Sequence, residues 1–144
     1  MPLPPRLLTA LALLGIVSVG QGLAEPKSIE TIERLLQECP DSAGLYAELA
    51  SLHFDESTIE GRRRAIGAMK QALRIEPSNP DYHVMLAEIL LASTFWHYGV
   101  EELKQALEID PAHDAAHYLL GKAYLDRALE GWQRKWFRNA ETEL

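Results

Sequence analysis

The sequence is poor in cysteine, and this excludes an internal disulfide. Its 144 residues include a single cysteine, Cys39, so no covalent cross-link within the chain helps to hold the fold. An unpaired thiol is either buried or used between molecules. We expect Cys39 to be buried.

Basic residues are also scarce. Lys and Arg number 14 against 21 Asp and Glu, which gives a net charge of −7. Nucleic-acid binding depends on neutralising phosphates with basic side chains, so we expect no nucleic-acid partner. The basic cluster Arg62–Arg64 is interpreted as a solvated helix face that pairs with nearby acids. Docking of an acidic partner or of anionic lipid is the alternative for this cluster.

The sequence lacks the patterns that enzymes use. It has no glycine-rich phosphate loop, and no histidine stands beside Cys39, as nucleophilic catalysis would need. His113 and His117 are four residues apart, as in the H-E-x-x-H zinc motif, but Asp114 replaces the glutamate and no third ligand is suitably spaced. We therefore predict that the protein is not an enzyme and holds no cofactor and no metal.

Long apolar runs are confined to the start of the chain. After a single basic residue, Arg6, the run Leu7–Val19 spans 13 residues, and Gly22 and Ala24 place small side chains before Glu25. This layout is typical of a secretory signal peptide, whereas a membrane span needs about 20 apolar residues. We predict that residues 1–24 are a signal peptide and that the mature chain has no stable membrane span. The protein would then be exported, and the lack of an internal disulfide favours the periplasm.

What the sequence does contain is a repeat of 34 residues. The octapeptide KQALRIEP begins at Lys70 and KQALEIDP begins at Lys104, and six of the eight letters agree. Within a copy, as in Tyr82–Leu90, apolar residues recur at i, i+3, i+4, i+7 and i+8, which indicates amphipathic helices. A single helix pair cannot bury its apolar face, so such copies stack. The repeat therefore predicts an all-α protein built from helix pairs.

Local signals predict where these helices begin and end. Asn79 is a good N-cap and Pro80 suits the first helical position, while Ser57–Glu60 has the pattern of a capping box. Ser28–Cys39 is predicted to be a lone helix that caps the first repeat.

The repeat frame also predicts a division of the chain. In the first copy the spacing between the closing prolines is 37 residues instead of 34, and we place the three additional residues in segment 54–64, between two helices. The predicted division is a signal peptide at 1–24, a capping helix and linker at 25–42, and repeats at 43–79, 80–113 and 114–144.

This frame resembles that of the tetratricopeptide repeat (TPR) family. The stretch HYLLGKAY, residues 117–124, has the family's Leu-Gly and Tyr positions, with His in place of the first aromatic residue. Ala65 and Gly99 occupy the small position of the second helix, from which Gln133 departs. The resemblance covers residues 43–144. It implies a right-handed superhelical stack of antiparallel helix pairs, with three repeats plus the N-terminal helix.

The resemblance further implies a concave groove lined by the first helix of each pair, which would bind a peptide or a partner protein. The positions that face this groove in similar proteins combine an apolar floor with a few charges here: Phe54, Val84, Glu88, Leu91, Tyr118, Lys122 and Leu125. The family's carboxylate-clamp subtype needs several basic and amide residues. Only Lys122 is suitable and Asp126 opposes it, so we do not expect that subtype.

The end of the chain supports an alternative function. Solenoids usually end with a polar capping element, but the third copy lacks a closing proline and ends with the aromatic residues Trp132, Trp136 and Phe137. The chain would then be a subunit, or the N-terminal part of a longer array, whose last helix docks to a neighbour. A homo-oligomer formed through the C-terminal helix is one form of this alternative.

Overall fold

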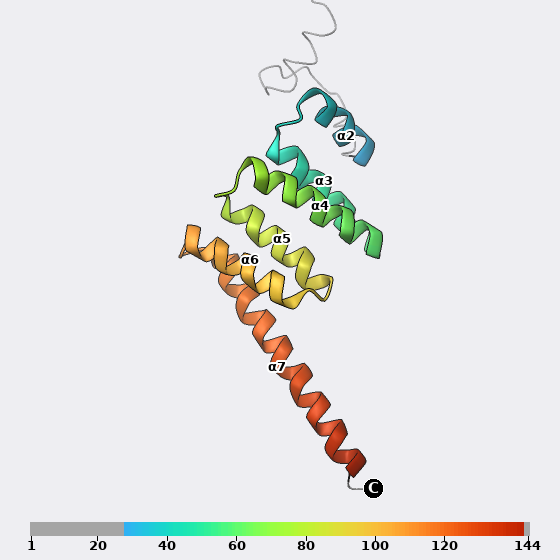
Figure 1. Ribbon diagram of the computed structural model, residues 1–144, viewed down its shortest axis with the longest axis vertical. Helices are drawn as coiled ribbons and strands as arrows, with labels where there is room; N and C mark the ends of the chain where they lie inside the picture. The colour runs from blue at the N-terminus through green and yellow to red at the C-terminus, as the bar shows by residue number, and fades with distance from the viewer. Residues whose placement is uncertain (1–27, 143–144) are drawn as a thin grey trace, which may run out of the picture.

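The computed structural model describes residues 28–142, and every regular element in that range is an α-helix (Figure 1). In chain order the helices are α2 (Ile29–Glu38), α3 (Ala43–Asp55), α4 (Ile59–Ile75), α5 (Pro80–Ala92), α6 (Trp96–Ile109) and α7 (Asp114–Thr142). Successive helices pack on one another along the chain, and α7 also touches α5. The all-α prediction is confirmed. The predicted signal peptide, residues 1–24, lies outside the described residues.

Two helix pairs, α3 with α4 and α5 with α6, form the centre of the stack. Three residues connect the helices within each pair, at 56–58 and at 93–95. The additional residues of the first copy therefore lie in α4, which has 17 residues against 14 in α6, and the prediction that they lie between the helices is wrong. Three residues are nearly one helical turn of 3.6. They lengthen α4 while it keeps the same face toward the core.

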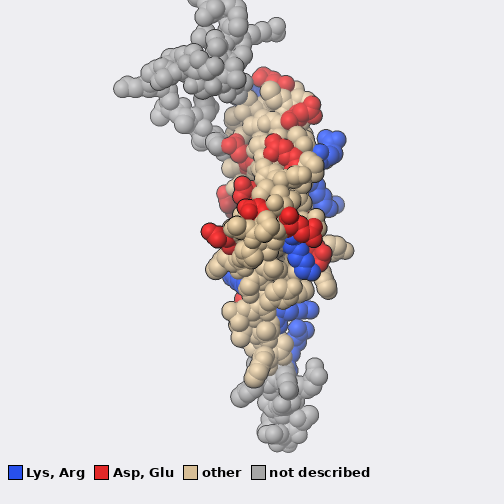
Figure 2. Space-filling view, turned by 90° about the vertical axis from the view of Figure 1, so that its left-hand side faces the viewer, with Lys and Arg blue, Asp and Glu red and all other residues tan. Residues whose placement is uncertain are grey.

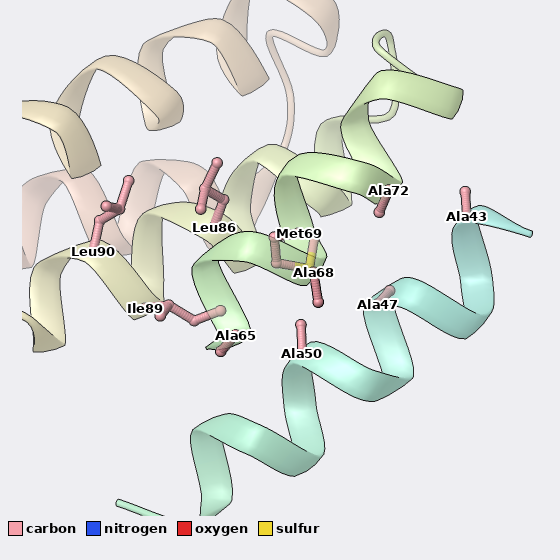
Figure 3. Packing of buried hydrophobic residues seen from close by; sticks show 10 residues of the cluster. All are labelled: Ala43, Ala47, Ala50, Ala65, Ala68, Met69, Ala72, Leu86, Ile89 and Leu90. Atoms are coloured by element: carbon pink, nitrogen blue, oxygen red, sulfur yellow. The ribbon is translucent and has the colours of Figure 1, made fainter. Parts of the chain in front are cut away.

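Small side chains dominate the core between the first pair and α5 (Figure 3). Ala50, Ala65 and Ala72 are fully buried, and Met69 fills the space beside them. The cluster consists of Ala43, Ala47, Ala50, Ala65, Ala68, Met69, Ala72, Leu86, Ile89 and Leu90. Alanine has no side chain beyond Cβ, so it lets helix axes approach closely, whereas the larger residues fill the space around each crossing.

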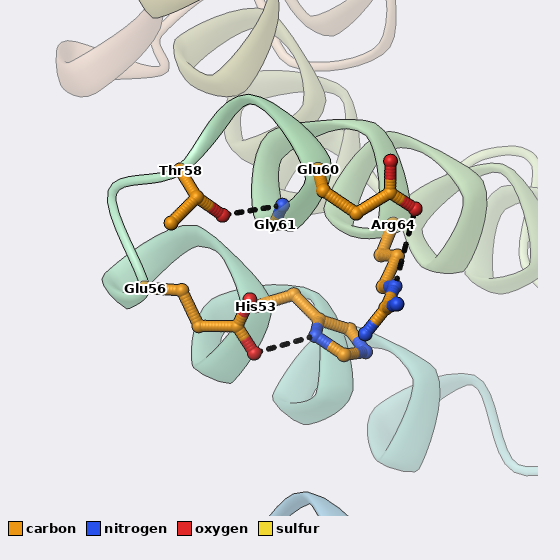
Figure 4. Close-up of polar contacts among 6 residues, drawn as sticks. All are labelled: His53, Glu56, Thr58, Glu60, Gly61 and Arg64. Carbon is orange, nitrogen blue, oxygen red and sulfur yellow. Dashed lines mark hydrogen bonds and ion pairs between the residues drawn. The ribbon is translucent and has the colours of Figure 1, made fainter.

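The turn between α3 and α4 differs by one residue from the predicted capping box (Figure 4). The N-cap of α4 is Thr58, whose Oγ1 accepts a hydrogen bond of 2.8 Å from the Gly61 amide. Ser57 instead has a φ of 55° and turns the chain. Glu60 pairs with Arg64 at 3.4 Å, so one member of the basic cluster pairs with a nearby acid. The other predicted N-cap, Asn79, is confirmed by its bond of 3.1 Å from the Asp81 amide.

Histidines hold the turns between copies in an equivalent way. His83 Nε2 donates to the carbonyl of Pro77 at 3.0 Å, and 34 positions later His117 Nε2 donates to the carbonyl of Pro111 at 2.9 Å. His113 accepts from the Ala116 amide at 3.3 Å, as a cap of α7, and its Nε2 lies 3.0 Å from Asp81. These contacts make the histidines structural parts of the repeat.

The N-terminal helix forms as predicted, but its thiol is exposed. The Ser28 side chain caps α2 by accepting from the Thr31 amide at 3.2 Å, and Ile32 is buried against the stack. Cys39 is the C-cap residue of α2, and its side chain is exposed. The prediction that Cys39 is buried is wrong, because the residue belongs to the turn that leads into α3 and not to the face of α2 that packs.

The third copy does not close into a helix pair. Residues 114–142 form a single helix of 29 residues, α7, where the repeat frame predicts two helices. The first part of α7 packs on α5 and α6, and the rest of the helix extends away from the stack (Figure 1). The described residues thus contain two complete helix pairs between α2 and α7.

Candidate functional site

A groove of about 690 Å³ lies where α3, α5 and α7 face one another near the start of α6. Five of the predicted groove residues line it, namely Phe54, Glu88, Leu91, Tyr118 and Lys122. The other lining residues are Ala92, Thr94, Trp96, Leu119, Ala123, Asp126, Arg127 and Glu130. The structure therefore brings together residues from three copies, as stacking of the first helices predicts.

Two of the predicted groove residues lie elsewhere. Val84 is only 9% exposed and belongs to a core cluster with Ala87, Leu103 and Ala106, so it has no surface to offer a ligand. Leu125 is 59% exposed but does not line the groove. The placement of Val84 in the groove is wrong because its side of α5 packs against α6.

Charges of both signs border the apolar floor of the groove. Lys122 Nζ donates to Asp126 Oδ2 at 2.9 Å, one turn further along α7. This hydrogen bond, together with the carboxylate charge, raises the pKa of the Lys122 ammonium above its usual 10.5, so Lys122 is charged at neutral pH. Glu88 lies on the α5 side, and Arg127 and Glu130 lie at the α7 end. A ligand would meet alternating charges instead of a basic clamp.

Trp96 is the largest of the groove residues that the sequence did not predict. It is the first residue of α6, and its indole Nε1 donates to the Ala123 carbonyl of α7 at 3.1 Å. Its ring meets Tyr124 edge to face with centroids 5.5 Å apart, and the Arg127 guanidinium lies 5.6 Å from its ring centroid. The family resemblance implies that the first helix of each pair lines the groove, whereas Trp96 begins the second helix of its pair. Its position directly after a three-residue turn was the available signal.

The residues of the alternative interface lie on the extending part of α7. Trp132 is 75% exposed, so it is free to contact another molecule. Trp136 and Phe137 belong to the same helix, but their side chains lie outside the part of the structure that is described.

Two other kinds of site concern metal ions and membranes. Within residues 28–142, no group of three or more His, Cys, Asp or Glu side chains is arranged to hold a metal ion. None of the helices described in that range combines the length and apolar content that a membrane span requires.

Comparison with known proteins identifies the fold. The sequence matches no protein-family model and no curated protein. Among solved structures, MamA is similar over 69% of this chain with a TM-score of 0.61 and 17% identity. The first TPR of Spaghetti (RPAP3), bound to the HSP90 peptide SRMEEVD, is similar over 69% of this chain with a TM-score of 0.63 and 17% identity.

The chain has a TPR-like helical fold.

A mutant of the Thermobaculum terrenum O-GlcNAc transferase is also similar, over 67% of this chain, with a TM-score of 0.61 and 29% identity. The present chain spans 57% of the MamA chain and 18% of the transferase chain, against 77% of the RPAP3 chain. The likeness to the transferase therefore concerns a small part of that protein, and it carries no inference about catalysis here.

Proposed function

We propose that this protein is a non-enzymatic scaffold that binds a peptide or a partner protein in the groove between α3, α5 and α7. The observation that supports this most directly is the convergence of Phe54, Leu91 and Tyr118 beside Glu88 and Lys122 around one open groove of about 690 Å³. Apolar floors with a few polar groups are the usual form of a peptide-binding groove. The peptide held by the similarly folded RPAP3 domain supports the same class of ligand.

The ligand would bind without large rearrangement of the scaffold. Helices α3, α5 and α7 are held by buried apolar clusters, so the groove residues occupy rigid elements before a ligand arrives. Pre-organised sites lose less conformational entropy on binding. The mixed charges of the groove would favour a ligand that carries both acidic and basic residues around an apolar anchor.

We test this function with a peptide selected on the protein itself. A displayed library of random dodecapeptides is selected on the immobilised chain, and the affinity of the recovered peptides is measured by fluorescence anisotropy. Glu88→Ala/Lys122→Ala removes one acid and one base from the groove. We expect it to weaken binding at least about tenfold, since each side chain would lose a charge-assisted contact.

The matched control removes an equivalent pair from the outer surface. Glu101→Ala/Lys104→Ala deletes an exposed ion pair of 2.9 Å on α6, and it should leave the affinity unchanged. Equal affinity of the peptides for the groove variant and the wild type would show that the groove is not the binding site.

We also propose that the protein works after export, in the periplasm. The support is the layout of residues 1–24, with a basic residue before a 13-residue apolar run and small residues before the cleavage position. Alkaline phosphatase fused behind residue 24 should be active in bacterial cells, because its disulfides form only outside the cytoplasm. An inactive fusion that is nevertheless synthesised, with an Arg6→Glu variant as a comparison, would argue for retention in the cytoplasm.

A second candidate function is self-assembly through the last helix. The observation that favours it is the extension of α7 beyond the stack with exposed Leu129 and Trp132, 53% and 75% exposed. Seven of the thirteen groove residues lie on α7, so assembly through this helix would affect the groove directly.

A further inference from the structure

The first helix of the third copy has a face that its own chain leaves uncovered. In α5, Val84 and Ala87 are 9% and 0% exposed because α6 packs over them. The equivalent residues 34 positions later in α7 are Tyr118, which is 69% exposed, and Gly121, which is also exposed. A second helix covers this face in the complete copies, and no described part of this chain covers it in the third.

This face stays uncovered because the third copy lacks the residue that turns the chain in the complete copies. In the two complete copies the turn is made by a residue with positive φ, Ser57 at 55° and Thr94 at 66°. The equivalent position in the third copy is Ala128, in the run Leu125–Glu130. Alanine is the strongest helix former, and the left-handed region is costly for it. The helix therefore continues, and residues 130–142 are held away from the face that they would cover in a hairpin.

The extending part of α7 has its own apolar stripe. Leu125, Leu129 and Trp132 are 59%, 53% and 75% exposed, and they stand at i, i+4 and i+7. In the sequence the stripe continues at Trp136, four positions on. The exposed side chains of Leu125, Leu129 and Trp132 have no partner among the described residues, so the extending part of α7 has an apolar face free for another helix.

Charge distinguishes the end of α7 from the rest of the molecule. Residues 28–126 contain 17 acidic and eight basic residues, whereas residues 127–142 contain four basic and two acidic. On the face drawn in Figure 2, Asp and Glu side chains gather over the body of the molecule, and the lower part, where α7 extends, shows Lys and Arg side chains among uncharged ones. The extending part of α7 is therefore less acidic than the body of the molecule.

We propose that the occupant of this face is a second copy of the chain. Two α7 helices pair antiparallel about a twofold axis at Leu129, and each places its residues 130–142 on the uncovered face of the other. Such an isologous contact repeats itself by symmetry, because the residue at position i meets the residue at position 258 − i of the other copy. The proposal rests on the second candidate function, self-assembly, and specifies its partner and its geometry.

The complete pair α5 with α6 shows which positions should meet. A Cβ atom built on Gly99 would lie 2.7 Å from Leu91 Cγ, so these two positions are in contact across the helix pair. Their equivalents in the third copy are Gln133 and Leu125. Within one continuous helix these two residues are about 12 Å apart, which is too far for a disulfide. In the proposed dimer they face each other across the two copies.

A disulfide experiment tests this geometry on the full chain. Leu125→Cys/Gln133→Cys is made in a Cys39→Ser background, and the protein is oxidised mildly and separated without reductant. We expect a covalent dimer. The control Ile59→Cys/Gln133→Cys uses a residue that is 80% exposed at the start of α4, and it should stay uncross-linked. An intrachain cross-link would show that the third copy closes on itself, and no cross-link would equally overturn the antiparallel pairing.

Light scattering on the unmodified chain distinguishes self-assembly in general from pairing through α7. We expect a dimer, and Leu129→Asp should weaken its association at least about 100-fold, because two carboxylates would meet at the axis. The control Ile59→Asp should remain a dimer. A monomeric wild type would overturn self-assembly as a whole. A dimer that neither forms the cross-link nor responds to Leu129→Asp would overturn the α7 pairing alone.

Discussion

At the scale of single residues, the fold depends on where side chains are small enough for helices to cross. A Cβ atom on Gly61 would lie 2.4 Å from the His53 carbonyl oxygen, which belongs to the backbone of α3. Gly67 lies in the same helix, α4, and a Cβ atom there would meet nothing within 4 Å. The two glycines lie in the same helix but have opposite structural roles.

We therefore expect the same substitution to have opposite effects at these two positions. Gly61→Ala should lower the free energy of unfolding by about 1–3 kcal/mol, because α3 and α4 must move apart. Gly67→Ala should raise it by about 0.5–1 kcal/mol, since alanine stabilises an exposed helix interior. Urea denaturation followed by circular dichroism measures both. A Gly61→Ala protein as stable as the wild type would show that the helix crossing is looser than described.

The caps show how far residue patterns predict local structure. In the pair Asn79-Pro80, Asn79 is the N-cap and Pro80 the first helical residue, as predicted, and the structure confirms it. In the stretch Ser57-Thr58, either hydroxyl could cap α4, and the capping box pattern favours Ser57. The turn that brings α4 back onto α3 uses Ser57 in the left-handed region, which leaves Thr58 as the cap. The choice depends on the path of the chain and not on the two side chains.

At the scale of elements, the docking of α7 depends on one aromatic side chain from α6. Trp96 donates a hydrogen bond to the Ala123 carbonyl at 3.1 Å and packs edge to face on Tyr124. α7 itself contributes the buried Ala116 and Ala123 and the partly buried Leu119 and Leu120. Trp96 adds a hydrogen bond and a ring contact to this apolar docking and lines that end of the groove.

We expect Trp96→Ala to loosen α7 selectively. Amide hydrogen exchange in residues 116–127 should become at least about tenfold faster, while α4 keeps its protection, because helices in a solenoid contact only their neighbours. Tyr98→Ala is a suitable control, since Tyr98 lies on the same helix and is 67% exposed. Unchanged exchange in α7 would indicate that the apolar side chains of α7 are sufficient for docking without Trp96.

At the scale of the whole molecule, the stack is asymmetric. It begins with α2, a short helix capped at its N-terminus by Ser28, and at the other end it continues into α7. The extending helix lies at this second end (Figure 1), and the first part of α7 lines the groove together with α3 and α5. A ligand in the groove would contact α7 directly, through Tyr118 and Lys122. Because Tyr118 also belongs to the face proposed for assembly, ligand binding and assembly would share part of α7.

The sequence by itself determined the helical periods, the 34-residue repeat and the stacking that follows from them, because apolar spacing and proline positions act locally. Together with the family resemblance it singled out five residues that line one groove in the structure. Only the tertiary structure decided that Val84 is buried, that Cys39 is exposed, that Trp96 joins the groove and that residues 114–142 remain one helix. These outcomes depend on which neighbour covers each helix face, and a helix face has no cover until the chain around it has folded.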